Sequence, residues 1–584
     1  MNSRVDRRRF LAAAGAAGAG LMAGEATAVE GIGDAPRRWD MSADVVVVGT
    51  GAAGFAAAVT AHSRGASVLL LEKGAIAGGT SAKSGGVYWI PNNPIMQAAG
   101  IPDPREDALK LMVRLAHPTR YVATSPTLGI EPAELARIAV IYDRGAETIL
   151  HLAKIGALKS ATASREPAPG ADHNSMQLQS SGWPDYHADL PENRVLYGRG
   201  MRPEAQGFAG GGVLIRQMKD YTDLHKVPVL SGHRAVAALL GKHGEVAGLA
   251  VETQGKRISV QAKKGVVFAS GGFIHNAAMR RAYLKGPAIY NGCGVMTNTG
   301  DFVAIAAALG APLGNMTNAW WLQQPLEVAL TAPGVSAEVW VPTGDSMIEV
   351  NKYGRRVVNE KMPYNERTQA HFYWDPSRRE YPNHILFMLY DEAVAQSKNN
   401  MYPIPRPGFD ASYVLKGQSW AELASVVDAR LESLGDRIGN VRLSSDFVTS
   451  LQQTVQRFNH YAATGNDEEF GRGSTPVQRF FNHAPADRSA ANPTLYPFAE
   501  TGPYYCVPLV AGTLDTKGGP VINEHSQVLN GAGEPIAGLY GAGNCVASPT
   551  AQAYWSAGAT LGCALVQGYA AAMHATGHAT GDRG

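Results

Sequence analysis

The chain has 584 residues, of which 45% are hydrophobic and 17% charged, and its formal net charge is +2. This length and composition predict a globular protein that buries a sizeable core in two domains. The near balance of charge argues against nucleic acid as a partner, because binding to phosphates requires an excess of Lys and Arg.

The N-terminal 28 residues are typical of an export signal. Arg7, Arg8 and Arg9 precede a short apolar stretch, 12–24, and an Ala-x-Ala cleavage pattern ends at Ala28. This order predicts a twin-arginine signal and hence a periplasmic protein that is exported after folding, with membrane association left open. The alternative is a disordered basic tail. Neither this stretch nor any later segment is long and apolar enough to span a bilayer, and removal of residues 1–28 leaves 48 basic against 48 acidic residues.

The next element has the pattern of a dinucleotide-binding motif. The apolar run Val45–Val48 predicts a strand, which leads through a Gly-x-Gly-x-x-Gly sequence into a helix. Gly49 permits the tight turn, Gly51 lets backbone N–H groups approach a pyrophosphate, and Gly54 allows the helix to pack closely on the strand. A second predicted strand ends at Glu72, whose carboxylate suits a ribose hydroxyl. We therefore predict a doubly wound α/β fold; the alternative is a glycine-rich loop that serves packing alone.

Further glycine-rich segments favour FAD over a nicotinamide cofactor. The loop 78–86 carries glycines and hydroxyl groups that can donate hydrogen bonds to a flavin. A buried strand and glycine turn follow at 265–272. Near the C-terminus, the strand-to-loop segment 538–544 precedes a long helix, roughly 559–575. The N-terminus of that helix would stabilise the negative charge of reduced flavin.

Together these motifs resemble the flavoprotein superfamily of fumarate reductases and 3-ketosteroid dehydrogenases, over nearly all of the chain after the signal. The resemblance implies a Rossmann-like FAD-binding domain built from both chain ends, 40–323 and 515–584, with a small β-meander around 227–263. It also implies an inserted α+β capping domain, 324–514. The FAD contacts that it implies are Gly49, Gly51, Ala53, Gly54, Glu72, Lys73, Gly79, Thr80, Ser81, Ser84, Gly85, Gly86, Ala235, Gly271, Asp301, Gly543, Asn544, Ala559 and Leu561.

The resemblance also bears on how the cofactor is held. In the respiratory-complex branch, a histidine just before the Gly-Gly of the second loop carries FAD covalently. Gly79 stands at the equivalent position here, so we predict a non-covalent, dissociable FAD.

Charge separates the branches of this superfamily. Fumarate reductases show Asn-Glu followed four residues later by a proton-donating Arg, whereas Asn359-Glu360 is followed by Tyr364. Their Asn-Arg-Leu-Gly-Gly, whose arginine clamps a carboxylate, corresponds to Tyr554–Gly558, and no arginine occurs between positions 488 and 583. A dicarboxylate would be left without a counter-charge, which is costly in a buried site. The pattern therefore favours a neutral ketone.

The segments 84–93, 359–364, 502–505 and 540–558 look like those of the 3-ketosteroid dehydrogenases. Carried over by position, the resemblance implies that Tyr364 is the base for the α-proton and that Tyr186 assists it. The Tyr554 hydroxyl and the Gly558 N–H would form an oxyanion hole for the developing enolate. Because a phenol has an ordinary pKa of about 10, such a base needs a neighbouring donor or positive field. For both Tyr364 and Tyr554 the alternative is core packing.

One departure leaves the regiochemistry open. The 1-dehydrogenating steroid enzymes usually show Tyr-Pro-Gly-x-Gly, whereas Tyr554-Trp555-Ser556 has a Tyr-x-Ser arrangement similar to that of the 3-oxo-5α-steroid 4-dehydrogenases. The small hydrophobic substrate is then a 3-oxosteroid or a simpler cyclic ketone. Trp320 and Trp321 would form an apolar wall for such a substrate or pack in the core.

Three functions follow. The first is FAD-dependent α,β-dehydrogenation of a cyclic ketone, with hydride passing to flavin N5 and electrons leaving to a quinone or a diffusible carrier. The second is an exported reductase of an α,β-unsaturated ketone or acid, and the third a non-catalytic FAD-binding protein. The four cysteines form no Cys-x-x-Cys or haem-attachment motif, which disfavours the reductase, and we predict no metal site. A periplasmic disulfide is compatible with them, but the spacing selects no pair.

Overall fold

The fold is taken from a computed structural model. It describes residues 29, 31–162, 184–205, 210–287, 292–332, 334, 339–340, 342–480, 482, 485 and 490–577. The predicted signal, 1–28, lies outside the described residues. Within the described part, no helix combines the length and apolar character needed to cross a membrane.

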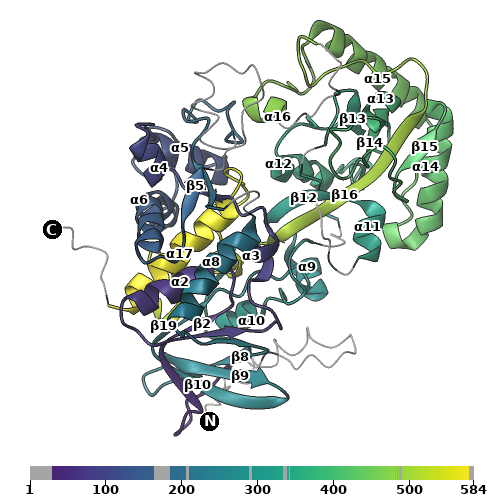
Figure 1. Cartoon of the computed structure of the whole chain (residues 1–584). Helices are drawn as coiled ribbons and strands as arrows, with labels where there is room; N and C mark the ends of the chain where they lie inside the picture. The colour runs from purple at the N-terminus through teal and green to yellow at the C-terminus, as the bar shows by residue number, and fades with distance from the viewer. Residues whose placement is uncertain are drawn as a thin grey trace, which may run out of the picture.

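The larger sheet has nine strands and a parallel centre, in the order β19, β10, β2, β3, β7 (Figure 1). Residues 45–47 on β2 are fully buried, as expected for a central strand covered on both faces. At the other side, β8 and β9 form an antiparallel meander with the first half of β10. The strands of this sheet are β1 (Gly31–Asp34), β2 (Met41–Val48), β3 (Val68–Glu72), β7 (Val229–Ser231), β8 (Arg234–Leu240), β9 (Val246–Thr253), β10 (Lys256–Phe268), β18 (Gln527–Leu529) and β19 (Pro535–Gly541).

Helices from both ends of the sequence cover this sheet. Helix α2 (Ala52–Ser63) lies against α17 (Ala559–Ala575), and both consist largely of buried small and apolar residues. A Cβ at Gly568 would lie 2.2 Å from the Ala53 carbonyl oxygen, so the two helices approach as closely as their backbones allow. The other helices that accompany this sheet are α3 (Gly79–Lys83), α4 (Pro94–Ala98), α5 (Arg105–Ala116), α6 (Pro132–Lys154), α8 (Gly211–Leu224), α9 (Ala277–Tyr283) and α10 (Asp301–Ala308).

A five-stranded antiparallel sheet forms the second body of the molecule, at the upper right of Figure 1. Its longest strand, β16, runs from this body toward α3 and α17. The strands are β12 (Ala319–Pro325), β13 (Met347–Val350), β14 (Ile385–Asp391), β15 (Leu415–Gly417) and β16 (Tyr504–Thr516). The accompanying helices are α11 (Leu326–Thr331), α12 (Tyr364–Thr368), η1 (Gln369–Phe372), α13 (Glu392–Ala395), α14 (Trp420–Leu434), η2 (Gly435–Ile438), α15 (Phe447–Thr464) and α16 (Pro476–Phe480).

Two small sheets complete the described elements. One contains β4 (Tyr88–Trp89), β5 (Ser160–Thr162) and β6 (Gly200–Pro203); the other pairs β11 (Leu313–Gly314) with β17 (Gly519–Pro520). A short turn of 3-10 helix, η3 (Gly543–Cys545), follows β19.

The predicted fold class is confirmed: a doubly wound sheet uses strands from both chain ends, and a separate α+β body is inserted between them. The strand predicted at 45–48 begins four residues earlier, at Met41, because residues 41–43 pair with β10 through its meander half. The last predicted helix, 559–575, has the predicted bounds. The exact limits of the two domains stay a prediction.

Candidate active site

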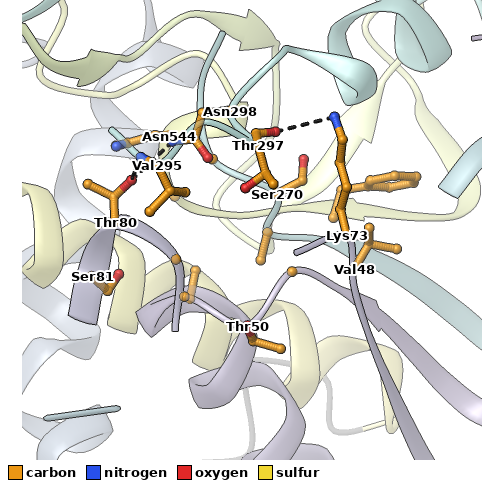
Figure 2. A pocket seen from close by; sticks show the side chains of 18 of the residues that line it. Val48, Thr50, Lys73, Thr80, Ser81, Ser270, Val295, Thr297, Asn298 and Asn544 are labelled. Atoms are coloured by element: carbon orange, nitrogen blue, oxygen red, sulfur yellow. Dashed lines mark hydrogen bonds between the residues drawn. The ribbon is translucent and has the colours of Figure 1, made fainter. Parts of the chain in front are cut away.

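An elongated cavity lies where the parallel strands β2, β3, β10 and β19 end (Figure 2). Ligands of doubly wound folds bind at this edge of the sheet. The residues predicted to contact FAD that line the cavity are Gly49, Gly51, Ala53, Glu72, Lys73, Gly79, Thr80, Ser81, Ala235, Gly271, Asp301, Gly543, Asn544 and Leu561.

The glycines of the first turn give the cavity its close backbone wall. Gly49 has φ +102°, and a Cβ there would lie 2.3 Å from the Ala269 carbonyl oxygen. A Cβ at Gly54 would lie 1.9 Å from the Gly49 carbonyl oxygen, so the helix can pack on the strand only with glycine at this position. Gly51 is the N-cap of α2, and a Cβ placed on it would lie 3.3 Å from Ser81 Oγ. The N-terminus of α2 thus lies at the cavity wall, where its backbone N–H groups suit a pyrophosphate; the N–H of Ala52 donates to Ser81 Oγ at 3.0 Å.

Glu72 and Asp301 supply carboxylates to the same cavity. Glu72 Oε2 accepts hydrogen bonds from Thr50 Oγ1 at 2.5 Å and from Thr50 N at 3.2 Å, which fixes its orientation. Asp301 is held by Lys73 Nζ at 3.1 Å and by Arg234 Nε at 2.8 Å. Burial alone would raise the pKa of Asp301, but the hydrogen bonds from Arg234 and the charge of Lys73 lower it overall. Both carboxylates are therefore ordered before a ligand arrives.

Five predicted contacts lie beside the cavity and do not line it: Gly54, Ser84, Gly85, Gly86 and Ala559. Ser84 Oγ donates to the Ser81 carbonyl oxygen at 2.7 Å and accepts from Gly86 N at 3.2 Å. Gly86 has φ +74° and packs against Gly210, which its virtual Cβ would approach within 2.4 Å. Ser84 and Gly86 thus shape the second glycine loop behind the cavity wall.

Several lining residues were missed by the sequence analysis: Thr50, His233, Arg234, Ser270, Thr297, Asn298, Asp515 and Thr560. Figure 2 shows Thr80, Asn298 and Asn544 gathered on one side of the cavity, with Lys73 on the other. Asp515, at the end of β16, accepts from Asn298 Nδ2 at 2.6 Å and from Gly272 N at 3.0 Å. Burial raises the pKa of Asp515 to about 6. A single acid at the end of an apolar strand carries no sequence signal for this position.

The three tyrosines selected from the sequence meet in one buried cluster. The ring centroids of Tyr364 and Tyr554 are 5.3 Å apart, and Tyr186 lies 5.9 Å from each of them. Tyr364 is the first residue of α12, Tyr186 comes from the loop 184–199, and Tyr554 precedes α17. Segments more than 350 residues apart in the sequence thus bring three phenols together.

Tyr554 and Gly558 form a hydrogen-bonded pair at the start of α17. Gly558 N donates to the Tyr554 hydroxyl oxygen at 3.2 Å. Gly558 caps α17 with φ +91°, and a Cβ there would lie 2.6 Å from the Val87 carbonyl oxygen, so only glycine fits this position. The pair lies at the N-terminus of a 17-residue helix, whose positive end favours negative charge. Its role as an oxyanion hole stays a prediction.

The cluster adjoins the cavity through Trp320. Its ring lies 5.0 Å from that of Tyr554, and its Nε1 donates to Asn544 Oδ1 at 2.9 Å. On its other side, Lys517 Nζ lies 4.1 Å from the Trp320 ring centroid and donates to the Ala553 carbonyl oxygen at 2.6 Å. Trp320 therefore joins a cavity-lining amide, a phenol and a buried ammonium group.

Electrostatics favours neutral phenols in the protein alone. Burial raises the pKa of Tyr364 well above its ordinary value, and the phenols of Tyr186 and Tyr554 raise it further. Burial likewise raises the pKa of Tyr186, with Tyr554 adding to the effect. If Tyr364 is the base, it must therefore become negatively charged only while substrate and cofactor are bound.

The charged motif around Tyr364 serves the core of the second body. Glu360 is buried between Arg356, whose Nε lies 2.9 Å from Oε1, and Arg472, whose Nη1 lies 3.2 Å from Oε2. The guanidinium of Arg367 donates to Gln323 Oε1 at 2.6 Å and to the carbonyl oxygens of Val339 and Met362 at 2.8 and 2.9 Å. These arginines are engaged by protein groups.

Two further polar side chains that adjoin these motifs, His187 and Tyr505, lie in different places. His187 Nε2 lies 3.0 Å from the Tyr554 carbonyl oxygen, so it contacts the backbone of the cluster. Tyr505 donates to Glu392 at 2.5 Å on the second sheet. No disulfide joins the four cysteines, all of which are buried within the described residues.

Glu349 on β13 lies behind the helix that carries Tyr364. Its Oε2 accepts from Gln323 Nε2 at 2.6 Å, and its Oε1 is 3.6 Å from Arg367 Nε. Burial raises the pKa of Glu349 from 4.5 to about 7. The folded protein keeps this proton up to pH 7, whereas the unfolded chain releases it near pH 4.5, so the stabilisation is lost as the pH rises between these values.

Glu349→Gln should remove this pH dependence. The unfolding free energy of the wild type, relative to that of the variant, should fall by about 3 kcal/mol as the pH rises from about 4.5 to about 7. Urea unfolding of both proteins across this range measures the difference. A pH-independent difference would contradict a raised pKa at Glu349.

Comparison with known proteins gives a family and a fold. The family profile described as "FAD binding domain" matches residues 44–561. A 3-oxosteroid 1-dehydrogenase of Mycolicibacterium smegmatis is 30% identical, covering 92% of this chain and 98% of its own. A 4-oxocyclohexanecarboxylate 2-dehydrogenase of Sinomonas cyclohexanicum is 29% identical, covering 92% and 93%. The solved 3-ketosteroid Δ1-dehydrogenase of Sterolibacterium denitrificans, in complex with 1,4-androstadiene-3,17-dione, has a TM-score of 0.75 at 24% identity, covering 92% and 99%.

Proposed function

The chain belongs to the FAD binding domain family, and on that basis we propose that it is an FAD-dependent dehydrogenase of a 3-oxosteroid or similar cyclic ketone. It would introduce a C=C bond next to the carbonyl group. Relatives at about 30% identity, by their names, act on 3-oxosteroids or on a cyclic oxo acid, which supports a dehydrogenase of this general type. The observation that carries the proposal is the buried phenol cluster with a Tyr554–Gly558 donor pair beside the FAD cavity.

FAD, when bound, would accept a hydride from the β-carbon at N5. The residues present fit this cofactor: the close backbone wall at Gly49, where a Cβ has no room, the N-terminus of α2 and two pre-oriented carboxylates line the cavity. Tyr364 would first lose its own phenol proton and then, as the phenolate, take the proton from the α-carbon as the C=C bond forms. Tyr554 and Gly558 would donate hydrogen bonds to the carbonyl oxygen while negative charge develops on it. Tyr186, in ring contact with Tyr364, would hold its phenol group.

Anaerobic mixing of the purified protein with a panel of ketones tests the proposal. We expect rapid bleaching of the oxidised flavin with a 3-oxosteroid, offered both as 4-androstene-3,17-dione and as its 5α-reduced form so that either regiochemistry can react, or with 4-oxocyclohexanecarboxylate. Comparing these two substrate classes distinguishes a steroid site from an oxo-acid site, and product analysis assigns the bond that is oxidised. Bleaching by neither, together with rapid reoxidation of chemically reduced protein by an α,β-unsaturated ketone or acid, would favour the reductase instead.

We further propose that FAD is held without a covalent bond. Gly79, which has no side chain to carry a flavin, lines the cavity, and its virtual Cβ meets no protein atom within 4 Å. Acid precipitation should therefore release essentially all of the flavin into the supernatant, where its absorbance is measured. Yellow colour retained in the washed pellet would mean that another residue is the attachment point.

We also propose export by the twin-arginine route, which the N-terminal sequence supports. Electrons would pass to a quinone or a diffusible carrier. Arg8→Lys combined with Arg9→Lys should retain the protein in the cytoplasm, because the pathway reads the arginine pair. Cell fractionation and flavin content of each fraction measure this. Equal periplasmic amounts of variant and wild type would exclude the route.

A further inference from the structure

A buried ion triad lies next to the phenol cluster. Arg199 is bracketed by two carboxylates, with Nη2 2.8 Å from Asp103 Oδ1 and Nη1 2.7 Å from Asp185 Oδ2. All three side chains are at most 2% exposed. Burying ions is expensive unless each is paired and hydrogen-bonded, and two carboxylates on one guanidinium leave an extra negative charge. Neither FAD nor the proposed chemistry accounts for this arrangement.

The two carboxylates have different surroundings. Asp103 makes the stronger ion pair, since it also accepts from Arg199 Nε at 2.9 Å and is therefore bidentate. Its remaining contact is with Asn92 N, at 2.9 Å. Asp185 makes a single bond to the guanidinium and accepts from Trp89 Nε1 at 3.0 Å.

Asp185 is linked to two of the segments that carry the clustered tyrosines: the loop with Tyr186 and the segment 554–558 with Tyr554. It precedes Tyr186 directly in the sequence, and the Ser556 side chain is a further hydrogen-bond partner of its carboxylate. Ser556 lies between Tyr554 and Gly558. Trp89 completes the connection, because its backbone N donates to the Gly558 carbonyl oxygen at 3.0 Å while its indole donates to Asp185.

We infer that Asp185, held by Arg199, is a positioning residue that sets Tyr186 relative to the Tyr554–Gly558 donor pair. This inference rests on the proposed dehydrogenase function. Asp185 does not line the cavity, and its carboxylate bonds to Arg199, Trp89 and Ser556 and not to a phenol group. It would therefore act through Tyr186 and Ser556. Its partner Asp103 contacts the loop 184–199 only at its last residue, Arg199, and the other hydrogen bond of its carboxylate is with Asn92 N.

Asp185→Asn and Asp103→Asn form a matched pair that separates positioning from anchoring. Each substitution is isosteric, removes one negative charge and leaves Arg199 with one carboxylate. If the triad served only to anchor Arg199, loss of the bidentate Asp103 would be the more damaging change. Positioning predicts the reverse order for turnover, because only Asp185 contacts the two loops.

We expect Asp185→Asn to lower kcat by roughly 10- to 100-fold, since small displacements of catalytic groups have effects of this size. KM should change little, because the apolar contacts that bind the ketone remain. Asp103→Asn should lower kcat less than about threefold while lowering the melting temperature at least as much as Asp185→Asn. Turnover is measured with 4-androstene-3,17-dione, its 5α-reduced form or 4-oxocyclohexanecarboxylate, whichever bleaches the flavin, and an artificial dye as acceptor.

Ser556→Ala keeps the whole ion triad and removes one hydrogen bond, so it tests the inference should Asp185→Asn fail to fold. We expect a kcat several-fold below that of the wild type at unchanged FAD content. Equal kcat for Asp185→Asn and Asp103→Asn, or wild-type kcat for Ser556→Ala, would overturn the inference. A wild-type protein inactive with every ketone would instead remove the proposed function itself.

Discussion

Tyr364→Phe should lower turnover by about 10²- to 10⁴-fold, the range that loss of a positioned general base produces. The hydroxyl is the only group removed, and the ring keeps its contacts with Tyr186 and Tyr554 at 5.9 and 5.3 Å. FAD content should stay that of the wild type, because Tyr364 does not line the FAD cavity. Steady-state turnover with the ketone that bleaches the flavin, together with the flavin-to-protein absorbance ratio, checks both statements.

Tyr505→Phe is the matched control. Tyr505 is also a tyrosine of the second body, but it is half-buried and its hydroxyl donates to Glu392, not to a residue of the phenol cluster. Its loss should leave turnover within about twofold, since substitutions away from the site have small effects. Near-normal turnover of Tyr364→Phe would remove that residue as the base, and equal losses in both variants would indicate a general defect of the second body.

Gly51→Val should give a folded protein without flavin. Gly51 has φ −72°, which any residue adopts, and a Cβ there would meet only Ser81 Oγ, at 3.3 Å, so a side chain fits once this serine hydroxyl shifts by a few tenths of an ångström. That side chain would, however, occupy the space in front of the α2 N-terminus. Losing two charge-assisted hydrogen bonds at about 1.5–3 kcal/mol each weakens FAD binding by roughly 10²-fold or more. Visible absorbance of the purified protein and its far-ultraviolet circular dichroism measure the two properties.

Gly85→Ala serves as the comparison for this variant. Gly85 belongs to the second glycine loop, yet it does not line the cavity, and a Cβ there meets nothing within 4 Å. It should keep a full complement of FAD. Retention of flavin by Gly51→Val would contradict the placement of a pyrophosphate at the start of α2.

The sequence predicted those parts of the site whose residues have few physical alternatives. Gly49 is required by the tight turn and Gly54 by close packing, so the spacing of these glycines indicates both the fold and the cavity. Tyr364 and Tyr554 were located by resemblance to a family, and the structure brings them within 5.3 Å of each other. Their roles stay proposals, since proximity alone does not assign a base.

Other features depend on long-range contacts that local patterns do not encode. Asp515 reaches the cavity because the long strand β16 ends there, and no neighbouring residue announces this. Asp103, Asp185 and Arg199 are 82 and 14 residues apart along the chain and form a triad only through tertiary packing. Ser84 and Gly86 were assigned to the cofactor but do not line the cavity: Ser84 Oγ bonds within its own loop, and Gly86 packs against Gly210 at the start of α8.

The close packing of α17 on α2 has a consequence for synthesis. The last quarter of the gene encodes strand β19, helix α17, which abuts Ala53, and the loop with Asn544, Tyr554 and Gly558. The turn at residues 49–54, which would bind the phosphates, is encoded near its start. While ribosomes are still translating earlier codons, the nascent chain lacks one wall of the nucleotide cavity. We therefore expect flavin to bind only after β19, which completes the β10 edge of the sheet, and α17, which completes the cavity wall, have been translated.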